Sequence, residues 1–236
     1  MEIAELHPWD VTPAAARHLQ AQLSRRVRLV DAVALDQITS VAGVDNAYVE
    51  TPGGTTAHAV AVRLRFPDLA VIETSAAAVP IAFPYVPGLL SFREAPAILA
   101  ALRGLAAAPD VVLFDGQGYA HPRRLGLASH LGLVLDRPTI GCAKSRLVGR
   151  YDEPGPAFGD HTPLIDRGEV VGAAVRTRPG HAPLFVSPGH RLSVATAVAI
   201  VLACCRDQQF LPEPTRLAHA LATAQARRHR RAPPAP

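Results

Sequence analysis

Residues 111–142 read VVLFDGQGYAHPRRLGLASHLGLVLDRPTIGC, and this stretch decides the fold. Its two ends, residues 111–114 and 139–142, are short apolar runs typical of buried strands, and residues 124–135 between them have the apolar pattern of a helix. Strand, helix and strand in this order predict a right-handed unit whose two strands run parallel. We therefore expect an α/β protein.

The chain before this unit predicts antiparallel hairpins. Strand-like segments cover residues 41–49, 57–66 and 70–79, and short breaks that contain proline, glycine and aspartate separate them. Breaks of this kind favour hairpins. A helix is expected from residue 13 to about residue 31, because Thr12 can serve as its N-cap and Pro13 suits the first turn.

The remaining segments complete a mixed sheet. We expect helices over residues 94–105, 193–207 and 214–227, and late strands near residues 169–176 and 183–187. Antiparallel hairpins followed by parallel β-α-β units, with helices on both faces, resemble the ribonuclease H-like fold. We expect one domain over residues 1–227 and a disordered, basic and proline-rich tail over residues 228–236.

Composition excludes several classes of protein. The 236 residues are 49% hydrophobic, which argues against disorder, and the formal net charge of +4 leans only modestly toward a polyanionic partner. The three cysteines form no disulfide framework and no zinc-site spacing. The N-terminus is acidic, unlike a signal peptide, and the apolar run at residues 194–205 is too short to span a bilayer. We expect a cytoplasmic protein with no membrane partner, and a monomer by default.

Lys144 is the only lysine, against 23 arginines among the 24 cationic residues. A coding bias toward alanine, arginine and proline replaces exposed lysines by arginines, so the lysine that remains is expected to need an ammonium group. An ammonium is a compact point charge, which a guanidinium does not reproduce. Lys144 also lies just past the predicted strand at residues 139–142. The alternative, a surface lysine that survived by chance, stays open on this observation alone.

Three carboxylates occupy positions where a mixed sheet would gather them. Asp45 lies inside an apolar strand, Glu94 begins a helix, and Asp115 ends a parallel strand at the edge where open α/β sheets place their sites. Acids in apolar surroundings are costly unless they are paired or bound to a cation. Oxygen ligands suit Mg²⁺, with Mn²⁺ as a substitute, and such ions commonly bridge to phosphates. Each acid alone also has a structural explanation, in a turn, a first helical turn or a strand.

Residues 115–130 are dense in glycine and in cationic donors. Gly116 and Gly118 allow a backbone to approach a ligand closely. His121, with the two arginines at 123 and 124, can meet a phosphate or a metal-bound water. A run of this composition directly after a buried strand indicates a binding loop.

Tyr85 stands in a stiff turn, because Pro84 and Pro87 restrict the backbone and Gly88 frees it. An aromatic ring on such a tip can insert into a base stack and hold open the gap left by an extruded nucleotide. A tyrosine packed beneath its own loop is the alternative. His219, alone on the last predicted helix, carries little weight on spacing, since a single helical histidine is more often structural.

Together these motifs resemble the endonuclease V family, which repairs deaminated nucleotides. The resemblance covers nearly the whole chain apart from its termini, and its most specific blocks are residues 84–88 (PYVPG) and 115–124 (DGQGYAHPRR). The other matching blocks are GVD at 43–45, SFRE at 91–94, GLA at 126–128, AKS at 143–145 and SPGHR at 187–191, followed by Arg216 and His219.

The resemblance implies a role for each matching residue. Asp45, Glu94 and Asp115 would hold the catalytic metal, and Lys144 would contact the reacting phosphate or its nucleophilic water. His121 and His219 would lie beside the metal, and Tyr85 would part the strands. The pocket for the extruded hypoxanthine would be lined by Gly88, Leu90, Gly116, Gly118, Leu127 and Leu147. Leu89 and Cys142 depart from the family pattern, without touching the metal chemistry.

The implied activity is nicking of the second phosphodiester bond on the 3′ side of deoxyinosine, which leaves 3′-hydroxyl and 5′-phosphate ends. A related nuclease that prefers inosine in RNA shares this metal chemistry and stays an alternative. A non-cutting binder of deaminated nucleic acid is a second one, which the acids and Lys144 disfavour because binding alone needs no metal. A phosphotransferase is disfavoured because the sequence has no GxxxxGK[ST] loop.

Overall fold

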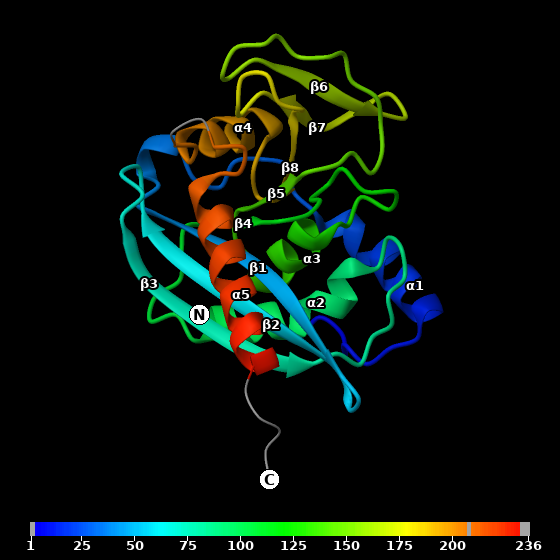
Figure 1. Cartoon of the computed structure of the whole chain (residues 1–236). Helices are drawn as coiled ribbons and strands as arrows, with labels where there is room; N and C mark the ends of the chain where they lie inside the picture. Colours follow the sequence, from blue (N-terminus) through cyan, green and yellow to red (C-terminus); the bar gives the residue numbers. More distant parts are fainter. Residues whose placement is uncertain (1–2, 207–208, 232–236) are drawn as a thin grey trace.

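An eight-stranded sheet in the order β3-β2-β1-β4-β5-β8-β7-β6 runs through the molecule (Figure 1). The computed structural model describes residues 3–206 and 209–231. The strands are β1 (Ser40–Thr51), β2 (Gly54–Arg65), β3 (Val71–Pro80), β4 (Val111–Phe114), β5 (Thr139–Ala143), β6 (His161–Asp166), β7 (Glu169–Val175) and β8 (Leu184–His190). The helices are α1 (Pro13–Leu23), α2 (Leu90–Arg103), α3 (Leu127–Leu135), α4 (Val194–Ala203) and α5 (Glu213–Arg231).

The pairing of the strands confirms the predicted mixed sheet. β1 pairs antiparallel with β2, and β2 pairs antiparallel with β3. β4 runs parallel to β1, and β5 runs parallel to β4. Every residue of β4 and of β5 is buried. Strands covered on both faces read as continuous apolar runs, which explains why the sequence reveals these two.

Helices cover both faces of the sheet, as predicted. Val111 and Leu113 of β4 pack in the core beneath α4 and α5, whereas Val112 and Phe114 pack in the core beneath α2 and α3. This alternation follows from the two-residue period of a strand. α5 lies across β1 and β2 (Figure 1).

The sequence predicts two late strands and misses β6. β6 is the last strand of the sheet: it pairs with β7 on one side and forms a single bridge, from Ile165 to Arg150. Only one of its six residues, Leu164, is buried, and the strand contains Pro163. Proline within a short polar run argues against a strand, and an edge position is where the sheet tolerates it.

Two helices begin or end away from their predicted limits. α1 ends at Leu23 rather than near residue 31, because the following chain bonds to the backbone of Arg191 instead of to itself: Arg191 N donates to Arg28 O at 2.6 Å, and Ala32 N donates to Arg191 O at 3.0 Å. α3 begins at Leu127 rather than at residue 124, because Arg124 has a φ of 56°. That conformation is incompatible with a right-handed helix.

α2 begins at Leu90, so Glu94 lies in its second turn and not at its start as predicted. The positive φ of Gly88 (78°) ends the preceding turn, and Phe92 N donates to Leu89 O at 3.1 Å to begin the helix. α4 ends at Ala203, before the predicted limit at residue 207, which lies outside the described residues.

α5 continues to Arg231, past the predicted limit at residue 227. Residues 228–230, where the disordered tail was expected to begin, are helical; Arg230 donates to the Tyr48 carbonyl at 3.2 Å, and His229 packs against His58 with ring centroids 4.9 Å apart. Residues 232–236 of the expected tail lie outside the described residues. The single domain over residues 1–227 stays a prediction. Over the described ranges, no helix combines the length and apolarity needed to cross a membrane.

Candidate active site

Two aspartates and a histidine meet where β1 and β4 run side by side. The register pairs Val44 with Phe114, so the residues that follow them, Asp45 and Asp115, are neighbours at the carboxyl end of β4. His219 of α5 joins them, and one ligand atom from each of the three side chains lies within 4.8 Å of the others. The structure thus brings together Asp45, Asp115 and His219, as the family resemblance implies.

A glycine allows α5 to lie this close to β1. A Cβ atom at Gly43 would stand 2.0 Å from the carbonyl carbon and oxygen of Pro214, a distance that no side chain tolerates. The start of α5 therefore rests directly on the backbone of β1. His219, about a turn and a half further along the helix, then reaches Asp45, and its Nδ1 lies 2.7 Å from Oδ2 of the aspartate.

Burial and charge act together on Asp45. Its side chain is 13% exposed, and burial raises its pKa, helped by the neighbouring carboxylate of Asp115. The hydrogen bonds from His219 and from the backbone N–H of Asn46 oppose this shift. Asp45 is therefore an acid whose charge the surrounding protein only partly compensates.

Glu94 reaches the same region from the α2 side of the sheet. It is not a member of the group within 4.8 Å, and its Oε1 accepts a hydrogen bond from the hydroxyl of Tyr48. Burial, together with the charges of Asp45 and Asp115, raises the pKa of Glu94 to about 7 although the hydrogen bond of Tyr48 lowers it. Burial and Glu94 in turn raise the pKa of Tyr48.

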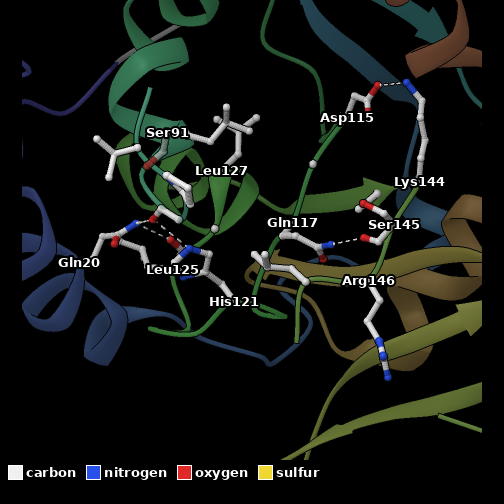
Figure 2. A pocket seen from close by; sticks show the side chains of 18 of the residues that line it. Gln20, Ser91, Asp115, Gln117, His121, Leu125, Leu127, Lys144, Ser145 and Arg146 are labelled. Carbon is white, nitrogen blue, oxygen red and sulfur yellow. Dashed lines mark hydrogen bonds and ion pairs between the residues drawn. The ribbon is translucent and has the colours of Figure 1, made fainter. Parts of the chain in front are cut away.

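Lys144 pairs with Asp115. The residue follows β5, the strand next to β4, and its Nζ lies 2.5 Å from Oδ2 of Asp115 (Figure 2). The lysine side chain is 45% exposed and the aspartate 17%. The only lysine of the chain thus lies at the acid cluster, that is, the carboxylates of Asp45, Glu94 and Asp115, and its ammonium is partly open to solvent.

A pocket of about 450 Å³ adjoins Asp115 and Lys144 (Figure 2). Seven of the eight residues expected to contact the nucleic acid line it: Tyr85, Gly88, Leu90, Gly116, His121, Leu127 and Leu147. Tyr85 is 73% exposed, so its ring is free to contact a ligand and is not packed beneath its loop. The lining combines apolar side chains such as Leu90, Leu127 and Leu147 with polar and charged ones, as a site that both encloses and orients a ligand requires.

Gly118 is the exception among the eight residues. It does not line the pocket, because its backbone lies against β8: the N–H of Gly118 donates to Ser187 Oγ at 2.8 Å, and an added Cβ would stand 2.4 Å from the carbonyl oxygen of Pro188. Its lack of a side chain serves close packing of the loop and not contact with a ligand.

The carbonyl oxygen of Gly88 holds the loop of Tyr85 in place. It accepts hydrogen bonds from Gln20 Nε2 at 3.0 Å, Arg123 NH2 at 2.8 Å and His121 Nε2 at 3.1 Å. Gly88 has a φ of 78°, and a Cβ there would stand 2.8 Å from Arg123. Glycine is therefore required twice, for its conformation and for the close approach.

His121 has both ring nitrogens engaged. Since Nε2 donates to Gly88, Nδ1 is the acceptor, and it receives the N–H of Arg123 at 3.2 Å. Burial, and then the charge of Arg123, lower the pKa of His121 to about 4. The structure therefore gives His121 a neutral ring in the pocket wall, outside the group of Asp45, Asp115 and His219. Its place beside the metal stays a prediction.

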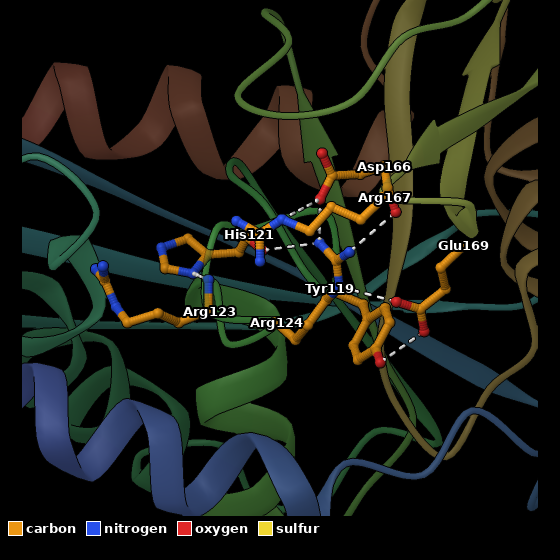
Figure 3. A network of polar contacts seen from close by, with 7 residues as sticks. All are labelled: Tyr119, His121, Arg123, Arg124, Asp166, Arg167 and Glu169. Atoms are coloured by element: carbon orange, nitrogen blue, oxygen red, sulfur yellow. Dashed lines mark hydrogen bonds and ion pairs between the residues drawn. The ribbon is translucent and has the colours of Figure 1, made fainter.

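Arg124 is held by two acids (Figure 3) and is not among the residues that line the pocket. Its guanidinium lies 2.8 Å from Asp166 and 3.0 Å from Glu169, and Tyr119 donates to the same glutamate at 2.8 Å. These contacts fasten the turn between β6 and β7 to the loop after β4. Arg124 thus serves the shape of this loop and is not available as the phosphate contact considered from the sequence.

Three residues at the site escape sequence reasoning. Gln20 on α1, 1% exposed, joins the Gly88 loop to the Leu125 carbonyl, and nothing in its local pattern announces this. Tyr48 follows Asp45 by three residues in β1, so its side chain lies on the opposite face of the strand. Ser91 lines the pocket. The sequence signal that points to it is its place at the start of the SFRE block.

Known proteins with similar sequences come from one family. The model of the family Endonuclease V matches residues 21–220. A curated endonuclease V from Methanothrix thermoacetophila is 50% identical over 227 residues, which cover 96% of this chain and 98% of the relative. Another, from Gloeobacter violaceus, is 54% identical over 215 residues, covering 91% of this chain and 86% of the relative.

Solved structures of endonuclease V proteins share the overall fold of this chain. The endonuclease V of Bacillus subtilis superposes with a TM-score of 0.93 at 33% identity, covering 98% of this chain and 99% of that one. That of Ciona intestinalis, in complex with a 24mer DNA containing an inosine followed by a ribo-adenosine, has a TM-score of 0.81 at 29% identity, covering 92% and 98%. The predicted ribonuclease H-like fold is confirmed.

Proposed function

The chain belongs to the endonuclease V family, and we propose that it is a Mg²⁺-dependent endonuclease that cuts DNA beside deaminated bases, mainly deoxyinosine. The bond hydrolysed is the second phosphodiester on the 3′ side of the lesion, and the ends are a 3′-hydroxyl and a 5′-phosphate. The observation that carries this proposal is the meeting of Asp45, Asp115 and His219 next to a pocket.

The donor set suits a hard divalent cation. Two carboxylates converge with an imidazole, and burial, helped by the neighbouring acids, raises the pKa of Asp45 and that of Glu94. A cation at this point would compensate these buried and mutually repelling charges. Asp45 and Asp115 would hold it, with Glu94 as the third predicted ligand and His219 beside them. Mg²⁺, or Mn²⁺ in its place, supplies polarisation of a phosphate and activation of water.

The residues of the chain supply the remaining chemistry. Lys144 places a positive charge beside Asp115, where it neutralises charge that develops on the phosphate, an electrostatic role that can be worth several kcal/mol. His219 fixes the orientation of the Asp45 carboxylate through its 2.7 Å contact.

The pocket would take the extruded base. Its apolar walls at Leu90, Leu127 and Leu147 suit the faces of a purine, and backbone at Gly88 and Gly116 approaches without a side chain in the way. Hypoxanthine pairs weakly, so it is cheap to unstack, which supplies part of the selectivity. The exposed ring of Tyr85 would fill the gap that the base leaves.

Inosine in RNA is the second candidate substrate. The Ciona intestinalis relative was solved in complex with a 24mer DNA in which a ribo-adenosine follows the inosine, and this observation favours the second candidate. For the present chain we propose a monomer that acts on DNA in the cytoplasm without a membrane partner.

Matched labelled strands separate these substrates. We expect a duplex with one deoxyinosine to be cut one nucleotide beyond the lesion on its 3′ side, and the adenine control to stay intact. Faster cutting of the inosine RNA strand than of the DNA strand would move the assignment to RNA. Retention of the inosine duplex in a gel shift, with no cut in either strand, would contradict the nuclease assignment.

A further inference from the structure

A row of hydrogen bonds leads from the pocket wall to the N-terminal segment. Ser91 lines the pocket and is 2% exposed. Its Oγ lies 2.9 Å from Nδ1 of His130, a histidine of α3 with no exposed surface. Nε2 of His130 lies 2.7 Å from Nε2 of His7, and Nδ1 of His7 lies 2.8 Å from the carbonyl oxygen of Pro8. Serine, two imidazoles and a carbonyl therefore form one continuous row.

The carbonyl at the far end gives the row its direction. A carbonyl oxygen only accepts hydrogen bonds, so Nδ1 of His7 carries the hydrogen. In a neutral His7, Nε2 then has a lone pair and accepts from His130. Nε2 of His130 must therefore carry the hydrogen in the 2.7 Å contact.

His130 passes this direction on to Ser91. Burial, and then the neighbouring His7, lower the pKa of His130 to about 3, so the ring holds one proton and not two. With that proton on Nε2, Nδ1 is bare and accepts the hydroxyl hydrogen of Ser91. The hydrogen of the serine points away from the pocket, and its lone pairs stay available to a ligand.

The surroundings keep this row in place. The rings of His7, Trp9, Phe92 and His130 pack on one another, with the His7 and Trp9 centroids 4.6 Å apart and those of Phe92 and His130 5.1 Å apart. Phe92 follows Ser91 in α2, so the same packing that encloses the histidines also fixes the helix that carries the serine. The N-terminal segment is thus part of the support of the pocket.

Deamination changes the base edge in the way that such a serine detects. Adenine has a bare ring nitrogen, N1, beside its amino group, whereas hypoxanthine has N1–H beside a carbonyl. The same N–H beside a carbonyl is shared by xanthine and, at N3, by uracil. A fixed acceptor therefore favours such bases over adenine and cytosine, whose bare ring nitrogen would leave two lone pairs facing each other. Guanine and thymine carry the same ring N–H, so this contact separates hypoxanthine from its parent adenine and does not separate it from them.

We propose that Ser91 is a specificity-determining residue of the base pocket, whose hydroxyl is held as an acceptor by His130 and His7 and receives the ring N–H of a deaminated base. This proposal rests on the proposed function, because it assigns the base that the pocket holds. Its ligand is a base with a ring N–H next to a carbonyl.

Cleavage of two lesions measures the effect. One duplex would carry deoxyinosine and the other deoxynebularine, whose purine ring has a bare N1 and no 6-substituent. The measured quantity is the ratio of kcat/KM for deoxyinosine to kcat/KM for deoxynebularine. The assay is run at about pH 8, where ordinary imidazoles are neutral. We expect Ser91→Ala to lower this ratio about tenfold, chiefly through KM for deoxyinosine. Ser91→Thr keeps a hydroxyl and should retain most of the ratio.

Two further variants separate recognition from folding. Ser129→Ala removes another fully buried serine, whose hydroxyl bonds to no other described residue, and should leave the ratio unchanged. His7→Phe keeps an aromatic ring beside Trp9 but removes the acceptor for His130, so it should lower the ratio about threefold while Ser91 is intact.

The outcomes are distinct. A wild-type protein that does not cut the deoxyinosine duplex contradicts the proposed function itself. A wild-type protein that cuts it, together with a Ser91→Ala variant whose ratio and KM are unchanged, overturns the role of Ser91. Equal losses on both lesions in Ser91→Ala, with an unchanged ratio, also overturn it, because they mark a structural role.

Discussion

The acid cluster and the wall of the pocket are neighbours that treat their polar groups in opposite ways. In the cluster, Asp45 and Asp115 stand side by side, and burial together with these acids raises the pKa of Glu94 to about 7. In the wall, the Gly88 carbonyl has three N–H donors around it, and both nitrogens of His121 have partners.

This difference shows which part of the site needs a ligand: the polar groups of the pocket wall are satisfied by the protein alone, and those of the acid cluster are not. Mutually satisfied groups hold the wall rigid without any ligand, as a preformed pocket requires. Like charges in the cluster are only partly compensated, by Lys144 and His219, until a cation joins them. We therefore expect metal to control chemistry and stability at the cluster, and to leave recognition by the wall largely unaffected.

Removal of Asp115 should separate the two regions most sharply. We expect Asp115→Ala to lower nicking by on the order of a thousandfold, because the position for the cation is lost. Binding of the deoxyinosine duplex, measured by gel shift, should stay within a few-fold of wild type. Asp68→Ala, at a surface ion pair with Arg65, is the control. Undiminished cutting by Asp115→Ala would show that the cluster is not the metal site.

The metal-free protein should lose stability as the pH rises. The folded pKa of Glu94, about 7, lies above its ordinary value of 4.5, and that of Asp45 is shifted in the same direction. The folded state therefore keeps protons that the unfolded chain releases, so the free energy of unfolding falls between about pH 4.5 and pH 7, by up to about 3 kcal/mol, and levels off above.

Denaturant unfolding in EDTA at a series of pH values measures this slope. Glu94→Gln, which cannot ionise, should flatten it, and Mg²⁺ should restore stability at pH 7 in the wild type. A metal-free protein whose stability is independent of pH across this window would mean that the cluster carries no uncompensated charge.

Lys144→Arg keeps the charge next to the cluster but changes its shape. We expect kcat to fall by roughly ten- to a hundredfold, since a planar guanidinium cannot replace a point charge 2.5 Å from Asp115. Arg103→Lys, at the end of α2, is the matched control in the other direction. Wild-type turnover in Lys144→Arg would show that the site does not require an ammonium group, and that the single lysine of the chain survived by chance.

Tyr85→Ala probes the wall and should give the smallest effect. We expect the preference for deoxyinosine over an undamaged duplex to drop about fivefold, with the rate of chemistry nearly unchanged under single-turnover conditions, because base stacking is worth about 1–3 kcal/mol. Equal losses on every substrate would instead identify Tyr85 as a residue that supports the fold.

How much the sequence predicts follows the same division. The apolar pattern of the sequence, here two short continuous runs, reveals the buried strands β4 and β5, and hence the edge at which Asp115 lies. It does not reveal β6, whose mostly exposed residues and proline give no strand pattern. The acids and Lys144 are visible because their residue types are unusual in apolar surroundings, or unusual in this chain.

The supports of the wall are hidden from sequence reasoning. Gln20 acts through a hydrogen bond to Gly88, 68 positions away, and His7 acts through His130, 123 positions away. No local pattern announces contacts across such separations. His219 is an intermediate case: its spacing alone indicates nothing, and the packing of α5 on Gly43 brings it to Asp45.

The most direct test of the central claim is a nicking assay on an end-labelled duplex with a single deoxyinosine, run in Mg²⁺ and in EDTA, with a gel shift of the same duplex in both. If a cation completes the acid cluster while the chain alone forms the pocket, the strand is cut one nucleotide 3′ of the lesion only in Mg²⁺, and the duplex is bound in both solutions. Cutting that persists in EDTA would contradict the account.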